Sequence, residues 1–203
     1  MSKALRELAR RGDMRLYTKG RRLIEEGDAG NTLFIILSGR LRAFSASDDG
    51  AREVTYGEYF PGEFLGEMSL DGGLRSASVE ACEASWCAMV TRLTLERHIT
   101  EFPEFAFELL SKVIRRARAA TLSLRAVALN DVYGRVVWLL NDRAVPGADG
   151  RRSFGPMTHQ QMADLLACTR PMVSRVMKEL EVGGYVSTGK HCVVLNRVLP
   201  ARF

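Results

Sequence analysis

An apolar pattern that begins just after Pro103 places the strongest constraint on the fold of this chain. Its members are separated alternately by three and four residues, and they are Phe107, Leu110, Ile114, Ala117, Thr121, Leu124 and Ala128. A mean separation of about 3.5 residues is the period of a coiled-coil seam. The pattern predicts a long helix at residues 103–130 that pairs with a second copy of the chain. The alternative is a helix packed on its own domain, for which a wider apolar face would serve.

The segment before this helix, at residues 13–100, shows patterns of short strands and turns. More than half of the chain's 18 glycines lie within it. The run LFIIL at residues 33–37 is typical of a buried strand, and a further strand pattern follows at residues 41–47 before the DDG turn at residues 48–50. Short strands between closely spaced glycines predict an antiparallel β-roll rather than a parallel α/β sheet.

The stretch FLGEMSLDGGLRSASVEA, at residues 64–81, has the composition of a phosphate site. Its candidate ligand-binding residues are Gly66, Glu67, Met68, Ser69, Arg75 and Ser76. Consecutive backbone N–H groups beside a fixed Arg hold a phosphate, whereas a carboxylate accepts a hydrogen bond from a sugar hydroxyl. The combination suits a sugar phosphate with a compact anionic end. The alternative is a buried ion pair between Glu67 and Arg75.

The third part, residues 131–203, contains a helix-turn-helix pattern. An apolar helix that ends before Pro146 precedes the exposed loop PGADGRR, and the T-x-x-Q sequence that starts at Thr158 is a capping box for the next helix. ACT at residues 167–169 makes the turn, and Thr169 caps a second helix with Pro171 in its first turn. Gly183 and Gly184 end that helix, and YVS, a GK turn and CVVLN then predict a two-stranded wing.

The outer face of this second helix has the residues of a recognition helix. The candidate DNA-binding residues are Thr169, Arg170, Ser174, Arg175 and Lys178. Arg side chains in a major groove read guanine through paired hydrogen bonds, whereas Lys178, a turn further along, is better placed for a phosphate. The alternative is an ordinary helical pair with a solvated basic face.

The distribution of charge favours a polyanion as the partner of the C-terminal part of the chain. Residues 1–110 carry 14 basic and 18 acidic side chains, a net charge of −4, whereas residues 111–203 carry 15 and 6, a net charge of +9. A basic C-terminal part and an acidic N-terminal part are expected when only the C-terminal part contacts nucleic acid.

Taken together, these segments resemble the Crp/Fnr family of bacterial transcription regulators. GDAGNTLFIILSGRLRAF resembles the family's β-roll, FLGEMSLDGGLRSAS its phosphate-binding cassette, and MTHQQMADLLACTRPMVSRVMKELE its helix-turn-helix. The resemblance implies an α+β fold with three parts. They are a β-roll effector domain at residues 1–102, a dimerisation helix at residues 103–130 and a winged helix-turn-helix at residues 131–203.

The resemblance also implies roles for particular residues. Gly66 and Ser69 are expected to line a nucleotide pocket, Glu67 to bind the ribose hydroxyl, and Arg75 with Ser76 to bind the cyclic phosphate. Thr121 is expected near the base and the partner subunit. The expected protein is a cytoplasmic homodimer that binds a pseudo-palindromic operator, is gated by a cyclic nucleotide with cyclic AMP favoured, and has RNA polymerase as a further partner. No covalent cofactor, metal or membrane is expected.

Two other regulatory functions stay open at this point. Ala120 stands where the family's best-known member carries a threonine that contacts adenine, and the stretch from Glu67 to Arg75 is shorter than in many cyclic-nucleotide binders. The chain could therefore be a DNA-binding regulator with another ligand or none, or a nucleotide-binding module that does not touch DNA. Catalysis is not expected, because His98 and His159 have no Ser or Cys nucleophile motif beside them. The four cysteines, which are Cys82, Cys87, Cys168 and Cys192, are too few and scattered for a disulfide scaffold.

Overall fold

The computed structural model describes residues 1–50, 52–147, 151–189 and 192–200. The chain divides into two compact units, Met1–Ala117 and Arg118–Phe203. No helix of the described residues is long and apolar enough to cross a membrane.

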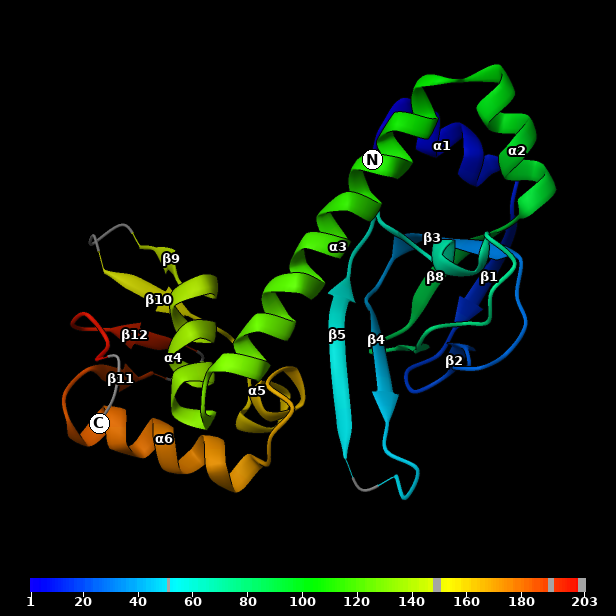
Figure 1. Cartoon of the computed structure of the whole chain (residues 1–203). Coiled ribbons are helices and arrows are strands. Elements are labelled where there is room, and N and C mark those ends of the chain that lie inside the picture. The colour runs from blue at the N-terminus through cyan, green and yellow to red at the C-terminus, as the bar shows by residue number, and fades with distance from the viewer. Residues whose placement is uncertain (51, 148–150, 190–191, 201–203) are drawn as a thin grey trace. The chain divides into compact units, whose positions relative to one another are not determined.

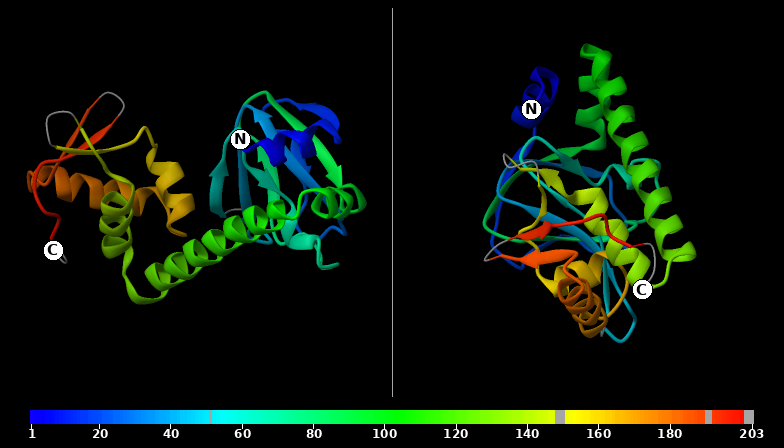
Figure 2. Two further views of the ribbon diagram at one scale, coloured as in Figure 1. Left: turned by 90° about the horizontal axis from the view of Figure 1, so that it is seen from above. Right: turned by 90° about the vertical axis from the view of Figure 1, so that its left-hand side faces the viewer.

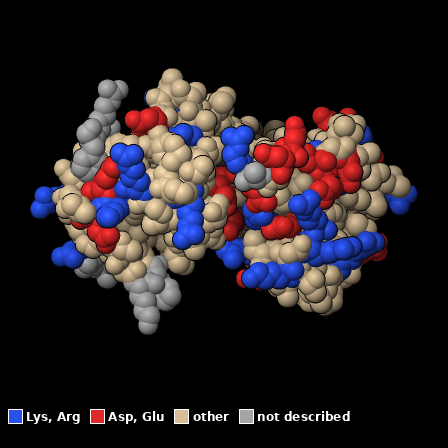
Figure 3. Space-filling view, turned by 90° about the horizontal axis from the view of Figure 1, so that it is seen from below, with Lys and Arg blue, Asp and Glu red and all other residues tan. Residues whose placement is uncertain are grey.

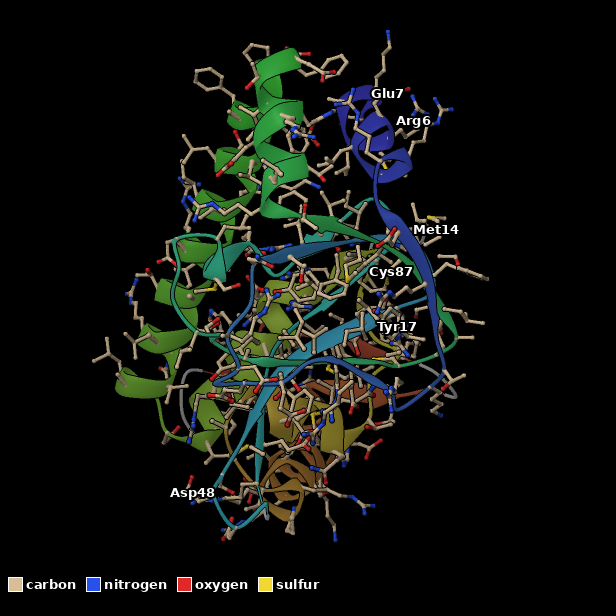
Figure 4. The ribbon with its side chains drawn as sticks, turned by 90° about the vertical axis from the view of Figure 1, so that its right-hand side faces the viewer. Arg6, Glu7, Met14, Tyr17, Asp48 and Cys87 are labelled. Carbon is tan, nitrogen blue, oxygen red and sulfur yellow. The ribbon has the colours of Figure 1, made fainter. Side chains whose placement is uncertain are left out.

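The first unit is a roll of two four-stranded antiparallel sheets (Figure 1). The strand orders are β1-β8-β3-β6 and β2-β7-β4-β5. The strands are β1 (Asp13–Tyr17), β2 (Arg22–Ile24), β3 (Thr32–Ser38), β4 (Leu41–Ala46), β5 (Glu53–Tyr59), β6 (Phe64–Leu65), β7 (Ser78–Ala81) and β8 (Ser85–Thr91). The predicted antiparallel β-roll is therefore confirmed, and Asp48 lies at the tip of the β4–β5 hairpin as the DDG turn predicts (Figure 4).

Strand β3 is apolar from Leu33 to Leu37 because both of its faces are covered. Phe34 and Ile36 belong to the core between the two sheets, where Cys87 of β8 is also buried. Leu33 and Ile35 point to the opposite face, which is covered by helices. Side chains of a strand alternate between faces, so a strand with a core on both sides has no polar face to show in its sequence.

Two helices at the edge of the roll lie outside the predicted strand pattern. They are α1 (Lys3–Arg10) and α2 (Arg92–Glu101), and they cover the second face of β3 and β8. Helix α2 corrects the interpretation of residues 13–100 as strands and turns. It begins where the Thr91 hydroxyl accepts a hydrogen bond from the Thr94 N–H, and it buries Leu95 and His98.

Helix α3 (Glu104–Leu129) is the long helix predicted from the heptad pattern. Its first half belongs to the first unit and its second half to the other. Seam residues are exposed on the single chain, with 75% of Phe107, 52% of Leu110, 48% of Ile114 and 69% of Leu124 accessible. A helix that leaves such side chains in water has an unpartnered apolar face.

The second unit packs three further helices against a four-stranded sheet (Figure 2). The elements are α4 (Val132–Arg143), β9 (Val145–Pro146), β10 (Arg152–Phe154), α5 (His159–Leu165), α6 (Arg170–Val182), β11 (Val186–Thr188) and β12 (Val193–Leu195). The sheet order is β11-β12-β10-β9, so the predicted two-stranded wing is extended by a second pair of short strands. The GK turn includes Lys190, which lies outside the described residues, as do residues 148–150 of the PGADGRR loop.

Candidate anion pocket and nucleic-acid interface

The backbone after β6 turns sharply at Gly66. Its φ of +93° lies in the left-handed region, and a one-turn 3-10 helix, η1 (Glu67–Ser69), follows at once. A Cβ at this position would stand 2.6 Å from the carbonyl oxygen of Thr32 and 2.7 Å from Nη1 of Arg75. Both the conformation and the close approach therefore require glycine.

Arg75 is held beside this turn by the loop between β2 and β3. Its backbone N–H donates to the carbonyl of Asp28 at 2.8 Å, and its own carbonyl accepts from the N–H of Gly27 at 2.9 Å. Gly30 lies against the guanidinium, because a Cβ there would be 2.2 Å from Nε. These contacts aim the side chain between Gly30 and Gly66.

The guanidinium of Arg75 is buried without a counter-ion. Arg75 is 8% exposed, and among the described residues no carboxylate lies within 4.0 Å of it. Its hydrogen bonds go to neutral acceptors on Thr32 and Gly66 instead. Burial lowers the pKa of Arg75, and the more distant charges of Glu67 and Asp28 oppose that shift. A buried cation that lacks a carboxylate is suited to binding an anion.

Glu67 does not pair with Arg75, so the structure contradicts the alternative of an ion pair between them. The carboxylate is instead 2.7 Å from Nη1 of Arg116 on α3, with side-chain exposures of 8% and 23% respectively. That nitrogen has no hydrogen bond of good geometry, so the contact is chiefly one of charge. Arg116 also donates from Nη2 to the carbonyl of Phe64 at 2.5 Å and covers the ring of Tyr59 at 4.7 Å. Arg116 lies off the predicted seam, and nothing in its sequence spacing pointed to this role.

The remaining predicted ligand residues differ in their placement. Ser69 is 2% exposed and donates to the carbonyl of Gly66 at 3.3 Å, so it supports the turn. Ser76 is exposed and lies 3.3 Å from the sulfur of Met68, which is 63% exposed. Thr121 lies on α3 within the second unit, whereas the other candidates belong to the first.

A cavity of about 260 Å³ adjoins this group of residues on the side of the β2–β3 loop. Arg75 is the member of the predicted set that lines it, together with Ile24, Asp28, Thr32 and Phe34 among others. Thr32 and Gly30 were not predicted as site residues, because only the fold brings this loop against Arg75. Within the described part of the chain, no group of His, Cys, Asp and Glu side chains is arranged to hold a metal ion.

The helix-turn-helix of the second unit has the predicted form. The capping box at Thr158 is complete, since its hydroxyl accepts from the N–H of Gln161 and the Gln161 side chain accepts from the N–H of Thr158. The turn between α5 and α6 passes through Ala167, whose φ is +50°. Arg135 of α4 donates to the carbonyl of Leu166 at 2.8 Å and ties the turn to the unit's core.

Helix α6 buries its inner face and presents the predicted basic one. Val173, Val176, Met177 and Leu180 are buried in the core of the unit. Thr169 is the N-cap residue of the helix as predicted, but its side chain makes no capping hydrogen bond. Arg170 and Lys178 are exposed, and the Arg175 side chain is 83% exposed with Nε 3.0 Å from Glu179. Basic side chains are visible over this unit, at the left of Figure 3.

Ser174 differs from its neighbours on the basic face. It is half-buried, and its hydroxyl is 2.9 Å from Nδ1 of His159 on α5. This contact links the first residue of α5 to the middle of α6. Ser174 therefore joins the two helices in addition to lying on the outer face.

Comparisons with known proteins agree with both halves of this description. Residues 14–101 match the family model for a cyclic nucleotide-binding domain, and residues 134–198 match the model for a Crp-like helix-turn-helix domain. The cyclic AMP receptor protein of Thermus thermophilus is 34% identical over 179 residues, which cover 86% of this chain and 80% of that protein. The cAMP-activated global transcriptional regulator Vfr of Pseudomonas aeruginosa is 33% identical over 193 residues, which cover 90% of this chain and 89% of that protein.

A solved structure extends the comparison to the fold. The c-di-GMP responsive global regulator CLP of Xanthomonas campestris superposes with a TM-score of 0.80. It is 23% identical in sequence, and the match covers 95% of this chain and 97% of that one. At this identity the likeness concerns the fold alone.

Proposed function

The chain belongs to the Crp/Fnr family of DNA-binding transcription regulators, and we propose that it is a homodimer whose binding to DNA is controlled by a cyclic nucleotide, with cyclic AMP favoured. The observation that carries the effector is Arg75, a residue that is 8% exposed and whose guanidinium has no carboxylate partner among the described residues. The phosphate of a cyclic nucleotide would supply the missing negative charge. Relatives named for cyclic AMP in Thermus and Pseudomonas support the choice of nucleotide.

The proposed pocket assigns a contact to each part of the nucleotide. Arg75 and Ser76 bind the cyclic phosphate, and the backbone from Gly66 to Ser69 closes around it. Glu67 binds the ribose hydroxyl through its carboxylate, whose Oε1 faces Arg116. The exposed side chain of Met68 is the group of this unit proposed for the base, and Thr121 of α3 is proposed for a contact with the partner subunit.

The proposed dimer forms along α3, and the proposed DNA contacts lie on α6. The exposed seam of α3 would pair with that of a second copy, which removes its apolar side chains from water. Two recognition helices then meet half-sites about one helical turn apart in a pseudo-palindromic operator. Their contacts come from Thr169, Arg170, Ser174, Arg175 and Lys178, and RNA polymerase is a further partner of the DNA-bound dimer.

A different effector is the second candidate, and a specific residue favours it. Ala120 precedes Thr121 on α3 and offers no hydroxyl to a base. The fold itself accommodates regulators of other ligands, since the structurally similar CLP is c-di-GMP responsive. The family assignment and the DNA-binding role do not depend on which nucleotide binds.

Calorimetric titration of the full chain with cyclic AMP, and separately with cyclic GMP, tests the effector. We expect binding by the wild type and a loss of at least about 100-fold in affinity for Arg75→Ala, since a buried charged contact is removed. Arg97→Ala is the matched control, because it removes an exposed Arg of the same unit. Equal affinities for the wild type and Arg75→Ala would contradict the pocket. No binding of either nucleotide would leave a DNA-binding regulator with another effector or none.

Fluorescence anisotropy with labelled duplexes selected from a randomised library tests the DNA part. We expect one selected sequence with two related half-sites, and tighter binding when cyclic AMP is present. If the selection enriches no sequence over the random pool while nucleotide is bound, the chain is a nucleotide-binding module that does not read DNA.

A further inference from the structure

The terminal nitrogens of Arg75 are fully engaged by acceptors of the protein itself. Nη1 donates to the carbonyl of Gly66 at 3.0 Å and to that of Thr32 at 3.1 Å. Nη2 donates to the same Thr32 carbonyl at 3.1 Å and to the hydroxyl oxygen Oγ1 of Thr32 at 2.8 Å. A guanidinium has four terminal N–H donors and one on Nε, so these four contacts account for every terminal donor.

The Nε edge of the guanidinium remains open. Nε of Arg75 donates to no described residue. It is nevertheless accessible, because the fully buried side-chain nitrogens without a partner are those of His98, Arg116 and Arg135. Nε–H and one N–H of Nη2 point the same way along one edge of the planar fork. This is an edge that a phosphate engages with two parallel hydrogen bonds.

One half of that edge is covered by the Thr32 hydroxyl. The two backbone carbonyls cannot leave, since that of Thr32 belongs to β3, where Thr32 is paired with Thr91 of β8, and Gly66 forms the left-handed turn. The hydroxyl is different, because rotation about one side-chain bond removes it. Thr32 Oγ1 is thus the acceptor that a phosphate oxygen can displace without moving the backbone.

We propose that the hydroxyl of Thr32 is a stand-in for a phosphate oxygen of the effector: it satisfies Nη2 of Arg75 in the ligand-free protein and is displaced when a nucleotide phosphate binds. This inference rests on the proposed function of Arg75 as the phosphate ligand. It makes Thr32 a positioning residue that sets affinity by stabilising the empty pocket. Without the hydroxyl, a buried N–H would be unsatisfied until the phosphate arrives.

Replacement of Thr32 by Val tests the proposal, because Val keeps the branched shape and the strand preference and removes only the acceptor. We expect Thr32→Val to bind cyclic AMP about tenfold more tightly than the wild type, since the ligand-free state alone loses a hydrogen bond. Thr32→Ser keeps an acceptor and should bind as the wild type does. Thr18→Val, which removes an exposed hydroxyl of the same unit, is the matched control and should change nothing.

Thermal unfolding of the same variants gives a second readout. Thr32→Val should unfold at a lower temperature than the wild type without nucleotide, and the gap should close at saturating cyclic AMP. Equal affinity for the wild type and Thr32→Val, with the gap in unfolding temperature unchanged by nucleotide, would mean that the hydroxyl stays bonded in the complex and would overturn the proposal. Weaker binding by Thr32→Val would overturn it as well. Binding by neither protein would instead refute the proposed effector, and this inference with it.

Discussion

Replacement of Arg116 should destabilise the first unit more than replacement of its partner Glu67 does. Arg116→Met keeps an apolar stem over Tyr59 but leaves the Glu67 carboxylate, whose side chain is 8% exposed, without a cation. A buried charge left alone in this way costs about 3–5 kcal/mol. Glu67→Gln leaves Arg116 with the Phe64 carbonyl, two aromatic rings and 23% exposure, so we expect a loss of about 1–2 kcal/mol.

The double variant Glu67→Gln with Arg116→Met should recover about half of the summed losses of the two single variants, because no uncompensated charge remains. The coupling free energy expected from the cycle is therefore about 2–3 kcal/mol. Urea unfolding measures it in a Trp138→Phe background, where Trp86 of β8 is the remaining tryptophan and reports on the first unit. Protomer concentration is kept constant, since association stabilises a folded dimer.

Two results would refute this reasoning. Additive losses in the double variant would mean that the 2.7 Å contact carries no interaction energy. A loss below about 0.5 kcal/mol for Arg116→Met would mean that the Glu67 carboxylate reaches water after the substitution.

Three further predictions concern the dimer, the response to pH and the DNA contact. Leu124→Asp should shift the protein toward monomer in sedimentation velocity, because it places a charge in the seam. Ser123→Asp adds the same charge off the seam and should leave the dimer intact. A dimer unchanged by Leu124→Asp would contradict the seam. Burial lowers the pKa of His98, so the side chain binds a proton more readily in the unfolded chain than in the folded one. The contribution of neutral His98 to the free energy of unfolding is therefore complete above about pH 6.5 and declines by up to about 1.4 kcal/mol per pH unit below it. His98→Phe should flatten that acid limb in urea unfolding from pH 5 to 8, and an equally steep limb in the variant would rule out His98 as its source. Arg175→Ala should weaken binding to the selected operator by about 1–3 kcal/mol and binding to random duplex far less, and equal losses would show that Arg175 contacts only phosphate.

The elements that the sequence predicted are those with strong local signals. The seven-residue pattern after Pro103 is a helix, and the capping box at Thr158 forms as expected, because each depends on residues within a few positions of one another. Helix α2 was missed because its sequence is largely polar, and its two buried residues, Leu95 and His98, are too few to produce a helical period. Its one usable signal was Thr91 at the N-cap.

The short strands and the tertiary contacts had no such signal. Strands β9 and β10 are two and three residues long. They form because β10 pairs with β12 on one side and with β9 on the other. The contact between Glu67 and Arg116 joins a loop of the roll to a helix distant in the sequence. The sequence offered only Arg75, eight residues away, as an alternative partner of Glu67, and the fold decides between the two arginines.

That choice between arginines bears on the chemistry of the pocket. Arg116 takes up the charge of Glu67, and Arg75 keeps its own, so this buried group of three side chains has a net charge of +1. A cyclic phosphodiester carries a single negative charge, whereas an open nucleotide monophosphate carries nearly two at neutral pH. Asp28 also lines the cavity, so a second negative charge on the ligand would be repelled, and the singly charged cyclic form is the better match to Arg75. Had Glu67 paired with Arg75, the phosphate would have faced a neutralised cation, and the same residues would have made a poor anion site.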